Sequence, residues 1–299
     1  DAISRWPMMD IFPSIVHRLI VLLIFIAIVA LISLMVSNNI EYILSQLPIY
    51  QTNLQIVVNN LATSFGLDNV PSIDKLIANW WSNIDIQTYA FRAFGSISSI
   101  GSVLFMTALY TGFLLSEASN FREKISKALK SDASQALEII SKVNNRIGIY
   151  LTIKTIINII LASVSFLIMW LMGIDSAVFW AVMIGFLNYI PYVGSAIGVG
   201  FPVGLTLAQF GSLHWAILAL VLLMAVQTFV GNILEPKMIG KSVNLSSFVV
   251  LVALVFWTAI WGLPGAILSI PLTSVLVILL AENQATRPLA VMFTADGDL

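Results

Sequence analysis

The stretch Asn188-Tyr189-Ile190-Pro191-Tyr192-Val193-Gly194 decides the fold, because it interrupts a long run without charge. Residues 176–234 contain no Asp, Glu, Lys or Arg, and neither do residues 242–281, which break at Trp261-Gly262-Leu263-Pro264-Gly265. Proline lacks an N–H and disturbs the preceding helical turn, while glycine accepts the dihedral angles of a chain reversal. Each run is therefore expected to form two helices joined by a tight turn.

The helices that precede these breaks are short for a membrane. Residues 177–190 and 247–261 number 14 and 15, or about 21–23 Å of α-helix, against a hydrocarbon core of about 30 Å. Arm length therefore favours re-entrant hairpins at 175–211 and 246–281, although the charge distribution fits two full spans equally well. Non-helical backbone at this depth needs protein or water around it, so the turns are expected to line a cavity.

The composition of the whole chain is typical of a membrane protein. Of 299 residues, 59% are hydrophobic and 10% are charged, whereas a soluble domain carries about 25% charged residues. Apolar runs predict spans at 19–36, 98–115, 147–172 and 213–230, of which only 147–172 holds a charged residue, Lys154. Each is long enough to cross a bilayer. We therefore expect an all-α, polytopic transmembrane helical bundle in contact with the lipid bilayer.

The basic residues predict the orientation. Residues 116–148 carry six Lys or Arg and residues 37–97 carry two, so the positive-inside rule places 116–148 in the cytoplasm and 37–97 outside. The N-terminal segment with its first span, 1–36, then starts inside, and the tail 282–299 ends inside. This is the expected topology of a multi-pass protein of the inner membrane.

The outer segment 37–97 is expected to consist of amphipathic helices. Apolar residues follow a 3.6-residue period from Ile40 to Leu61, with a kink expected near Pro48. A second helix is expected to open at Pro71, with Trp80 and Trp81 on one side. These tryptophans suit a headgroup-level anchor, and a protein–protein core fits them equally well.

The core region 149–281 contains a weak repeat. The span 147–172 precedes the hairpin 175–211, and the span 213–230 precedes the hairpin 246–281. Each break is followed by a related phrase, Gly194-Ser195-Ala196-Ile197 with Pro202 or Gly265-Ala266-Ile267 with Pro271. Two such units inserted in opposite directions are the pattern of inverted-repeat secondary transporters.

Four motifs occur in order along the chain: Phe186-Leu187-Asn188-Tyr189-Ile190-Pro191-Tyr192-Val193-Gly194-Ser195-Ala196-Ile197-Gly198, Glu235-Pro236-Lys237-Met238-Ile239-Gly240-Lys241, Trp261-Gly262-Leu263-Pro264-Gly265-Ala266-Ile267-Leu268-Ser269-Ile270-Pro271-Leu272 and Arg287-Pro288-Leu289-Ala290. In their order and spacing they resemble the AI-2E (autoinducer-2 exporter-like) permease family, and the resemblance covers essentially the whole chain. The resemblance implies export of small molecules such as autoinducer-2, or antiport of a monovalent cation and protons. It also implies a homo-oligomer, with five copies expected. Members usually have two further transmembrane helices ahead of this segment, so the chain is expected to lack them.

The predicted transport pathway or gate is built from polar and turn residues inside apolar surroundings. They are Asn188, Pro191, Gly194, Ser195, Asn158, Lys154, Gln227, Asn232, Glu235, Lys237, Pro264 and Gly265. Each group has a structural alternative. Lys154 could extend its ammonium to the membrane interface, the amides could serve only to hydrogen-bond helices together, and Glu235 with Lys237 could mark the end of a helix.

Other functions find little support in the sequence. The net charge is −1, which gives no field for nucleic acid, and the chain has no cysteine for a disulfide, a thiolate or a metal site. Gly198-Val199-Gly200 lacks the strand of a dinucleotide fold, and Ser195 lacks the Gly-x-Ser-x-Gly elbow of a serine nucleophile. No enzymatic activity, cofactor or metal is expected. A secondary transporter is the first hypothesis, with a passive channel or a non-transporting oligomeric scaffold as alternatives.

Overall fold

The computed structural model describes residues 14–66, 133–239 and 244–298, together with 106, 109–110, 112–114, 117, 120–121 and 123–130. In these parts the chain folds into helices and turns, and no strand is present. The expectation of an all-α membrane protein is confirmed. The predicted helix at Pro71 with Trp80 and Trp81, and most of the predicted span 98–115, lie outside the described residues.

The chain divides into two compact units, residues 1–48 with 71–124 and residues 49–70 with 125–299. In the first unit the described residues of the predicted span 98–115 are helical, and Lys124 forms an ion pair with Glu117. Helix α1, Ser14–Ser64, runs from the first unit into the second and contains Pro48. It joins the predicted span 19–36 to the predicted amphipathic helix, because residues 37–39 include neither proline nor glycine to end it.

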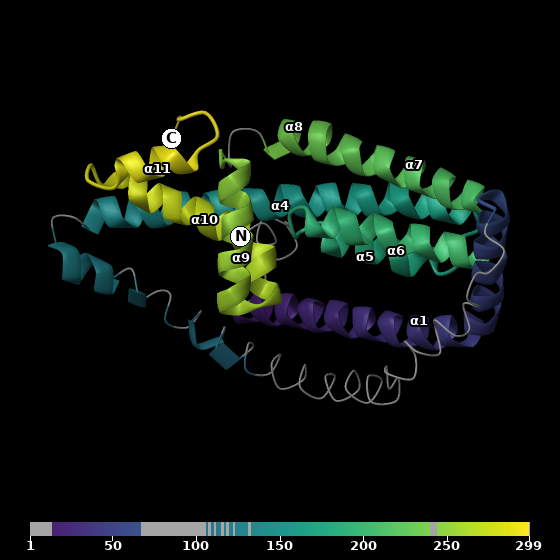
Figure 1. Ribbon diagram of the computed structural model, residues 1–299. Helices are drawn as coiled ribbons and strands as arrows, with labels where there is room; N and C mark the ends of the chain where they lie inside the picture. The colour runs from purple at the N-terminus through teal and green to yellow at the C-terminus, as the bar shows by residue number, and fades with distance from the viewer. Residues whose placement is uncertain are drawn as a thin grey trace. The chain divides into compact units, whose positions relative to one another are not determined.

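The second unit holds the core region (Figure 1). Its helices are α4 Ala133–Leu171, α5 Ala177–Leu187, α6 Val193–Phe210, α7 Leu213–Phe229, α8 Glu235–Ile239, α9 Ser247–Trp261, α10 Leu263–Glu282 and α11 Arg287–Phe293, with a π-helical turn at Val230–Leu234 between α7 and α8. Helices α4, α5, α6 and α7 pack side by side, while α9 packs against α10.

Four described helices are long and apolar enough to cross a membrane: Ala133–Leu171, Val193–Phe210, Leu213–Ile239 and Leu263–Glu282. The two predicted hairpins are therefore asymmetric. The first arms, α5 and α9, have 11 and 15 residues, but the second arms, α6 and α10, have 18 and 20. At 1.5 Å per residue α6 and α10 reach about 27–30 Å. Arm length thus argues for re-entry of α5 and α9 only, and re-entry of whole hairpins stays a prediction.

Both hairpins close through a glycine that lies on a carbonyl oxygen of the preceding helix. A Cβ atom on Gly194 would come within 1.9 Å of the Leu187 oxygen, and one on Gly265 within 1.9 Å of the Trp257 oxygen. No side chain fits at such a distance, so only glycine lets α6 and α10 turn back this tightly. The weak sequence repeat therefore corresponds to a shared turn geometry, in which Gly194 and Gly265 occupy equivalent positions.

The C-terminal part of α1 forms hydrogen bonds with the open end of the first hairpin, where α5 begins and α6 ends. The Tyr50 hydroxyl donates a hydrogen bond to Asp175 at 2.9 Å, and the Asn53 amide donates to the Ala208 and Gln209 carbonyl oxygens at 3.0 and 2.6 Å. The Gln209 side chain in turn accepts from the Asp175 N–H at 2.8 Å. These bonds fix where α5 begins and where α6 ends.

Candidate functional site

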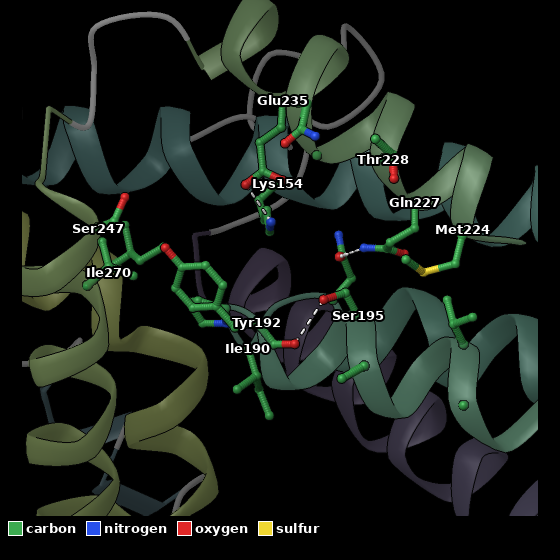
Figure 2. A pocket seen from close by; sticks show the side chains of 18 of the residues that line it. Lys154, Ile190, Tyr192, Ser195, Met224, Gln227, Thr228, Glu235, Ser247 and Ile270 are labelled. Carbon is green, nitrogen blue, oxygen red and sulfur yellow. Dashed lines mark hydrogen bonds and ion pairs between the residues drawn. The ribbon is translucent and has the colours of Figure 1, made fainter.

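A cavity of about 720 Å³ lies where the turn between α5 and α6 faces α7, α8 and the start of α9 (Figure 2). Leu245, Ser247 and Val250 contribute from α9 and the segment before it, and Ile270 contributes from α10. Its polar lining residues are Lys154, Asn188, Tyr192, Ser195, Gln227, Thr228, Asn232, Glu235 and Ser247. Cavities that bind small ligands are typically about 300–1,000 Å³, so this one has the size for a small solute.

One face of the helical rod α7–α8 supplies much of the wall. The lining residues recur at helical spacing, namely Leu220, Met224, Gln227, Thr228, Gly231, Asn232 and Glu235. Residues three to four apart lie on the same side of a helix. This face therefore becomes more polar from Leu220 towards Glu235, along a single line.

The π-helical turn Val230–Leu234 sets the direction of Glu235. An extra residue in a helical turn rotates everything after it by about 100° relative to a regular α-helix. Pro236 follows directly and lacks the N–H that a regular helix would use. Wide turns of this kind often occur at functional sites, and here the turn continues the helix to Ile239 rather than ending it at Glu235.

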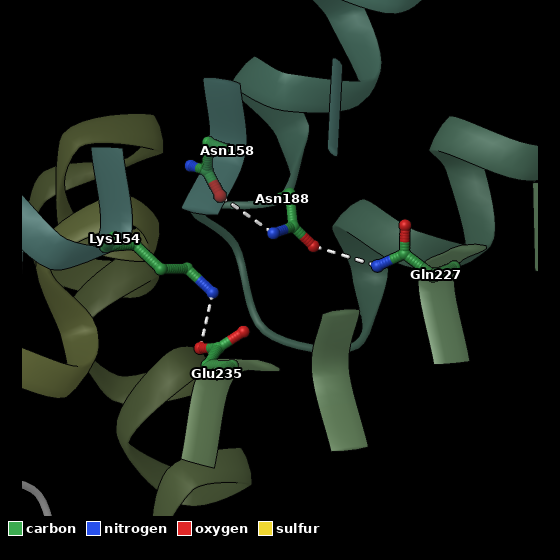
Figure 3. Close-up of polar contacts among 5 residues, drawn as sticks. All are labelled: Lys154, Asn158, Asn188, Gln227 and Glu235. Carbon is green, nitrogen blue, oxygen red and sulfur yellow. Dashed lines mark hydrogen bonds and ion pairs between the residues drawn. The ribbon is translucent and has the colours of Figure 1, made fainter. Parts of the chain in front are cut away.

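A buried ion pair joins α4 to α8 at the cavity wall (Figure 3). The Lys154 ammonium lies 2.6 Å from a Glu235 carboxylate oxygen. The Lys154 side chain is 6% exposed and that of Glu235 is 23% exposed. A buried charge needs a partner, because removal from water costs several kcal/mol. The Lys154 ammonium is thus held by Glu235 at the cavity wall.

Three amides form a chain that joins α4, the hairpin turn and α7 (Figure 3). The Asn188 amide donates to the Asn158 oxygen at 2.8 Å, and the Gln227 amide donates to the Asn188 oxygen at 2.9 Å. Asn158 and Asn188 are buried. Asn188 therefore bonds two helices and also lines the cavity, and a role of the amides in transport stays a prediction.

The turn itself is held in an unusual conformation. Tyr192 has φ +60°, although it is not glycine, and a bulky residue in this region of φ is strained. Ser195 donates a hydrogen bond to the Tyr192 carbonyl oxygen at 2.8 Å, and the Tyr189 and Thr155 hydroxyls lie 2.6 Å apart. The strained turn is therefore fixed by side chains from α4 and α6.

The structure brings most of the predicted pathway residues to this cavity. Lys154, Asn188, Pro191, Ser195, Gln227, Asn232 and Glu235 line it. Asn158 lies behind Asn188, and Gly194 packs against the Leu187 carbonyl oxygen. Lys237, Pro264 and Gly265 do not line it, since Lys237 is exposed and the other two lie at the turn of the second hairpin.

Some lining residues carry no sequence signal of their own. Thr228 and Ser247 are common residue types in apolar helices, and Tyr192 looks like an ordinary turn residue. The spacing of Leu220, Met224 and Thr228 could have indicated a shared face, but it gives no hint of which face meets the hairpin. That choice depends on how α7 packs.

A multi-pass helical membrane protein with a polar chamber of solute size is the class that this fold and this site define. The chain matches the AI-2E family transporter family over residues 6–284, and it belongs to that family. The resemblance seen in the four motifs is confirmed. The family consists of transporters and permeases rather than enzymes.

Similar proteins that are named as transport proteins support this assignment. The chain is 32% identical over 247 residues to a candidate transport protein of Borreliella burgdorferi, covering 82% of this chain and 67% of that protein. It is 30% identical over 289 residues to a candidate transport protein of Haemophilus influenzae, covering 92% and 81%. It is 27% identical over 251 residues to the AI-2 transport protein TqsA of Escherichia coli K12, covering 83% and 72%.

Proposed function

We propose that the protein is a secondary transporter that carries a small, polar, uncharged solute of the autoinducer-2 type through the cavity beside the first hairpin. The observation that carries this proposal is the lining of the cavity. Its charged residues, Lys154 and Glu235, neutralise each other at 2.6 Å, and the remaining polar groups are amides and hydroxyls. Such groups exchange hydrogen bonds with a hydroxylated solute and offer no net charge to an ion.

The relative TqsA supports this choice of solute, because it is named for AI-2 transport and its similarity covers 83% of this chain. The geometry adds a physical reason. A solute rich in hydroxyl groups can replace water on Gln227, Asn232 and Ser195 without leaving a buried polar group unpaired.

Exchange of a monovalent cation for protons is the second candidate function. Glu235 favours it, because its carboxylate is at the cavity wall and already binds a cation, the Lys154 ammonium. A Na⁺ or Li⁺ ion would have to displace that ammonium. A proton on Glu235 would weaken the same contact, so cation and proton would compete at one carboxylate.

Flux into proteoliposomes tests both functions with the full-length protein. Labelled autoinducer-2 analogues should enter wild-type vesicles, and Asn188→Leu should lower the initial rate at least tenfold, because it removes both hydrogen bonds of the amide chain. Asn145→Leu is the matched control, since it makes the same change at an exposed position of α4 away from the cavity. Flux of Na⁺ or Li⁺ against a pH gradient, with no solute flux, would favour the second candidate.

Two other outcomes would contradict secondary transport. Solute flux that ignores every ion gradient would indicate a passive channel. A non-transporting scaffold would have a dry cavity, which single cysteines can detect because the chain has none of its own. Asn232→Cys should react with a water-soluble thiol reagent, whereas Ser165→Cys, buried in α4 and away from the cavity, should not.

The proposal includes an inner-membrane location with both termini in the cytoplasm and a homo-oligomer, five copies by family resemblance. The basic residues of 116–148 support the orientation. Native mass spectrometry of the protein in lipid nanodiscs counts the copies, and protease protection in oriented vesicles checks the termini.

A further inference from the structure

Tyr150 and Ser274 carry two buried hydroxyl groups that find no hydrogen-bond partner in the described part of the chain. Tyr150 lies on α4 and Ser274 on α10, and both oxygen atoms are shielded from solvent. The Tyr150 side chain is 3% exposed. A buried hydroxyl without a partner is unfavourable, so two of them at one place point to something that satisfies both.

Both residues line the same small cavity between α4 and α10. Its other walls are Arg146, Ile147, Pro271, Val275 and Ile278. The volume open to the centre of a water molecule is about 10 Å³, and one ordered water needs roughly 10–15 Å³ with two or more polar partners. The cavity thus has the size of a single water and is too small for a phosphate or a carboxylate ligand.

The position of this cavity along α4 connects it with the transport site. Arg146, Tyr150, Lys154 and Asn158 follow one another at intervals of four residues, which places them on one face of the helix. Arg146 is exposed, and the next three are buried. A polar line therefore runs from the surface at Arg146, past the small cavity, to the Lys154–Glu235 pair.

We propose that Tyr150 and Ser274 hold one ordered water molecule, which joins α4 to α10 one helical turn from Lys154. The Tyr150 hydroxyl donates to the water, and the water donates to Ser274. With the water in place, both buried hydroxyl groups have a hydrogen-bond partner. This water site does not depend on the proposed transport function.

Radiolytic hydroxyl labelling with mass spectrometry tests the water directly, because radicals form at bound water and oxidise the nearest side chain. Tyr150 should be oxidised at least fivefold faster than Tyr50, which is similarly buried but donates its hydroxyl hydrogen to Asp175. Ser274→Val fills the cavity and should reduce the rate at Tyr150 to that of Tyr50. Ser269→Ala is the control, because Ser269 is a buried serine of α10 whose hydroxyl already donates to Ala266. Equal rates at Tyr150 and Tyr50 in the wild-type protein would show a dry cavity and overturn the proposal, whether or not a variant folds.

Discussion

The two hairpins of the core share one way of turning and differ in what they turn around. In each, a glycine lies on a carbonyl oxygen of the preceding helix, Gly194 on Leu187 and Gly265 on Trp257. In the first hairpin five residues, 188–192, connect the two helices, whereas in the second only Gly262 connects them. The longer turn carries Asn188, Pro191 and Tyr192 to the wall of the large cavity.

In the second hairpin, the polar side chains form their hydrogen bonds within the hairpin. The Trp257 indole donates to Thr273 at 3.0 Å, and Thr273 donates to the Ser269 carbonyl oxygen at 2.7 Å. Its contribution to the large cavity, through Ser247, Val250 and Ile270, is mostly apolar. The two hairpins therefore share the glycine contact that closes their turns. Only the first hairpin has the longer turn and the amide that give the cavity its polar wall.

The largest effect is expected from the ion pairs that accompany the two hairpins. Glu235→Gln removes the partner of buried Lys154 and should destabilise the fold by about 3 kcal/mol, at the low end for a buried pair because Glu235 is partly exposed. Glu282→Gln, at the end of the second hairpin, breaks a 3.8 Å contact with exposed Lys142 and should cost less than about 0.5 kcal/mol. Denaturant titration in detergent micelles, followed by tryptophan fluorescence, measures both.

A double variant is the control for this prediction. Lys154→Met with Glu235→Gln leaves no buried charge, so it should recover most of the stability that Glu235→Gln loses. If Glu235→Gln and Glu282→Gln lowered the free energy of unfolding equally, the buried ion pair would contribute no more to stability than the exposed one.

The glycines should give a smaller effect that is alike in both hairpins. Gly194→Ala and Gly265→Ala each force a methyl group against a carbonyl oxygen and should cost about 2–3 kcal/mol. Gly204→Ala is the matched control in α6, where an added Cβ meets no atom within 4 Å, and it should stabilise the helix slightly. The same titration measures all three, and a large loss for only one of the two turn glycines would break the structural parallel between the hairpins.

The smallest effect should separate the hairpins by function. Trp257→Phe removes the bond to Thr273, and Gln227→Leu removes the bond to Asn188; each should cost about 1 kcal/mol. Only Gln227→Leu should change the thiol reactivity of a cysteine at position 232, because only Gln227 lines the cavity. An equal change in reactivity from Trp257→Phe would mean that the second hairpin also shapes the cavity.

Much of the fold follows from the sequence because apolar runs and helix breakers act locally. The predicted arm 247–261 coincides with α9, and the predicted span 147–172 lies in α4 except for its last residue. The predicted end of the first span at Val36 is not seen, since α1 continues to Ser64. A span and an amphipathic helix look different in composition, yet nothing in residues 37–39 forces the backbone to leave the helix.

The class of protein follows from the sequence alone, because two such long uncharged runs could not be exposed to water in a soluble protein. The positions of the turns also follow from it, because proline and glycine act locally. Which polar residues meet depends on the three-dimensional packing. Asn158, Asn188 and Gln227 come from three separate helices, and the pairing of Lys154 with Glu235 depends on the π-helical turn before α8. Side-chain partners distant in sequence are set by the rotation and packing of whole helices, which no local pattern encodes.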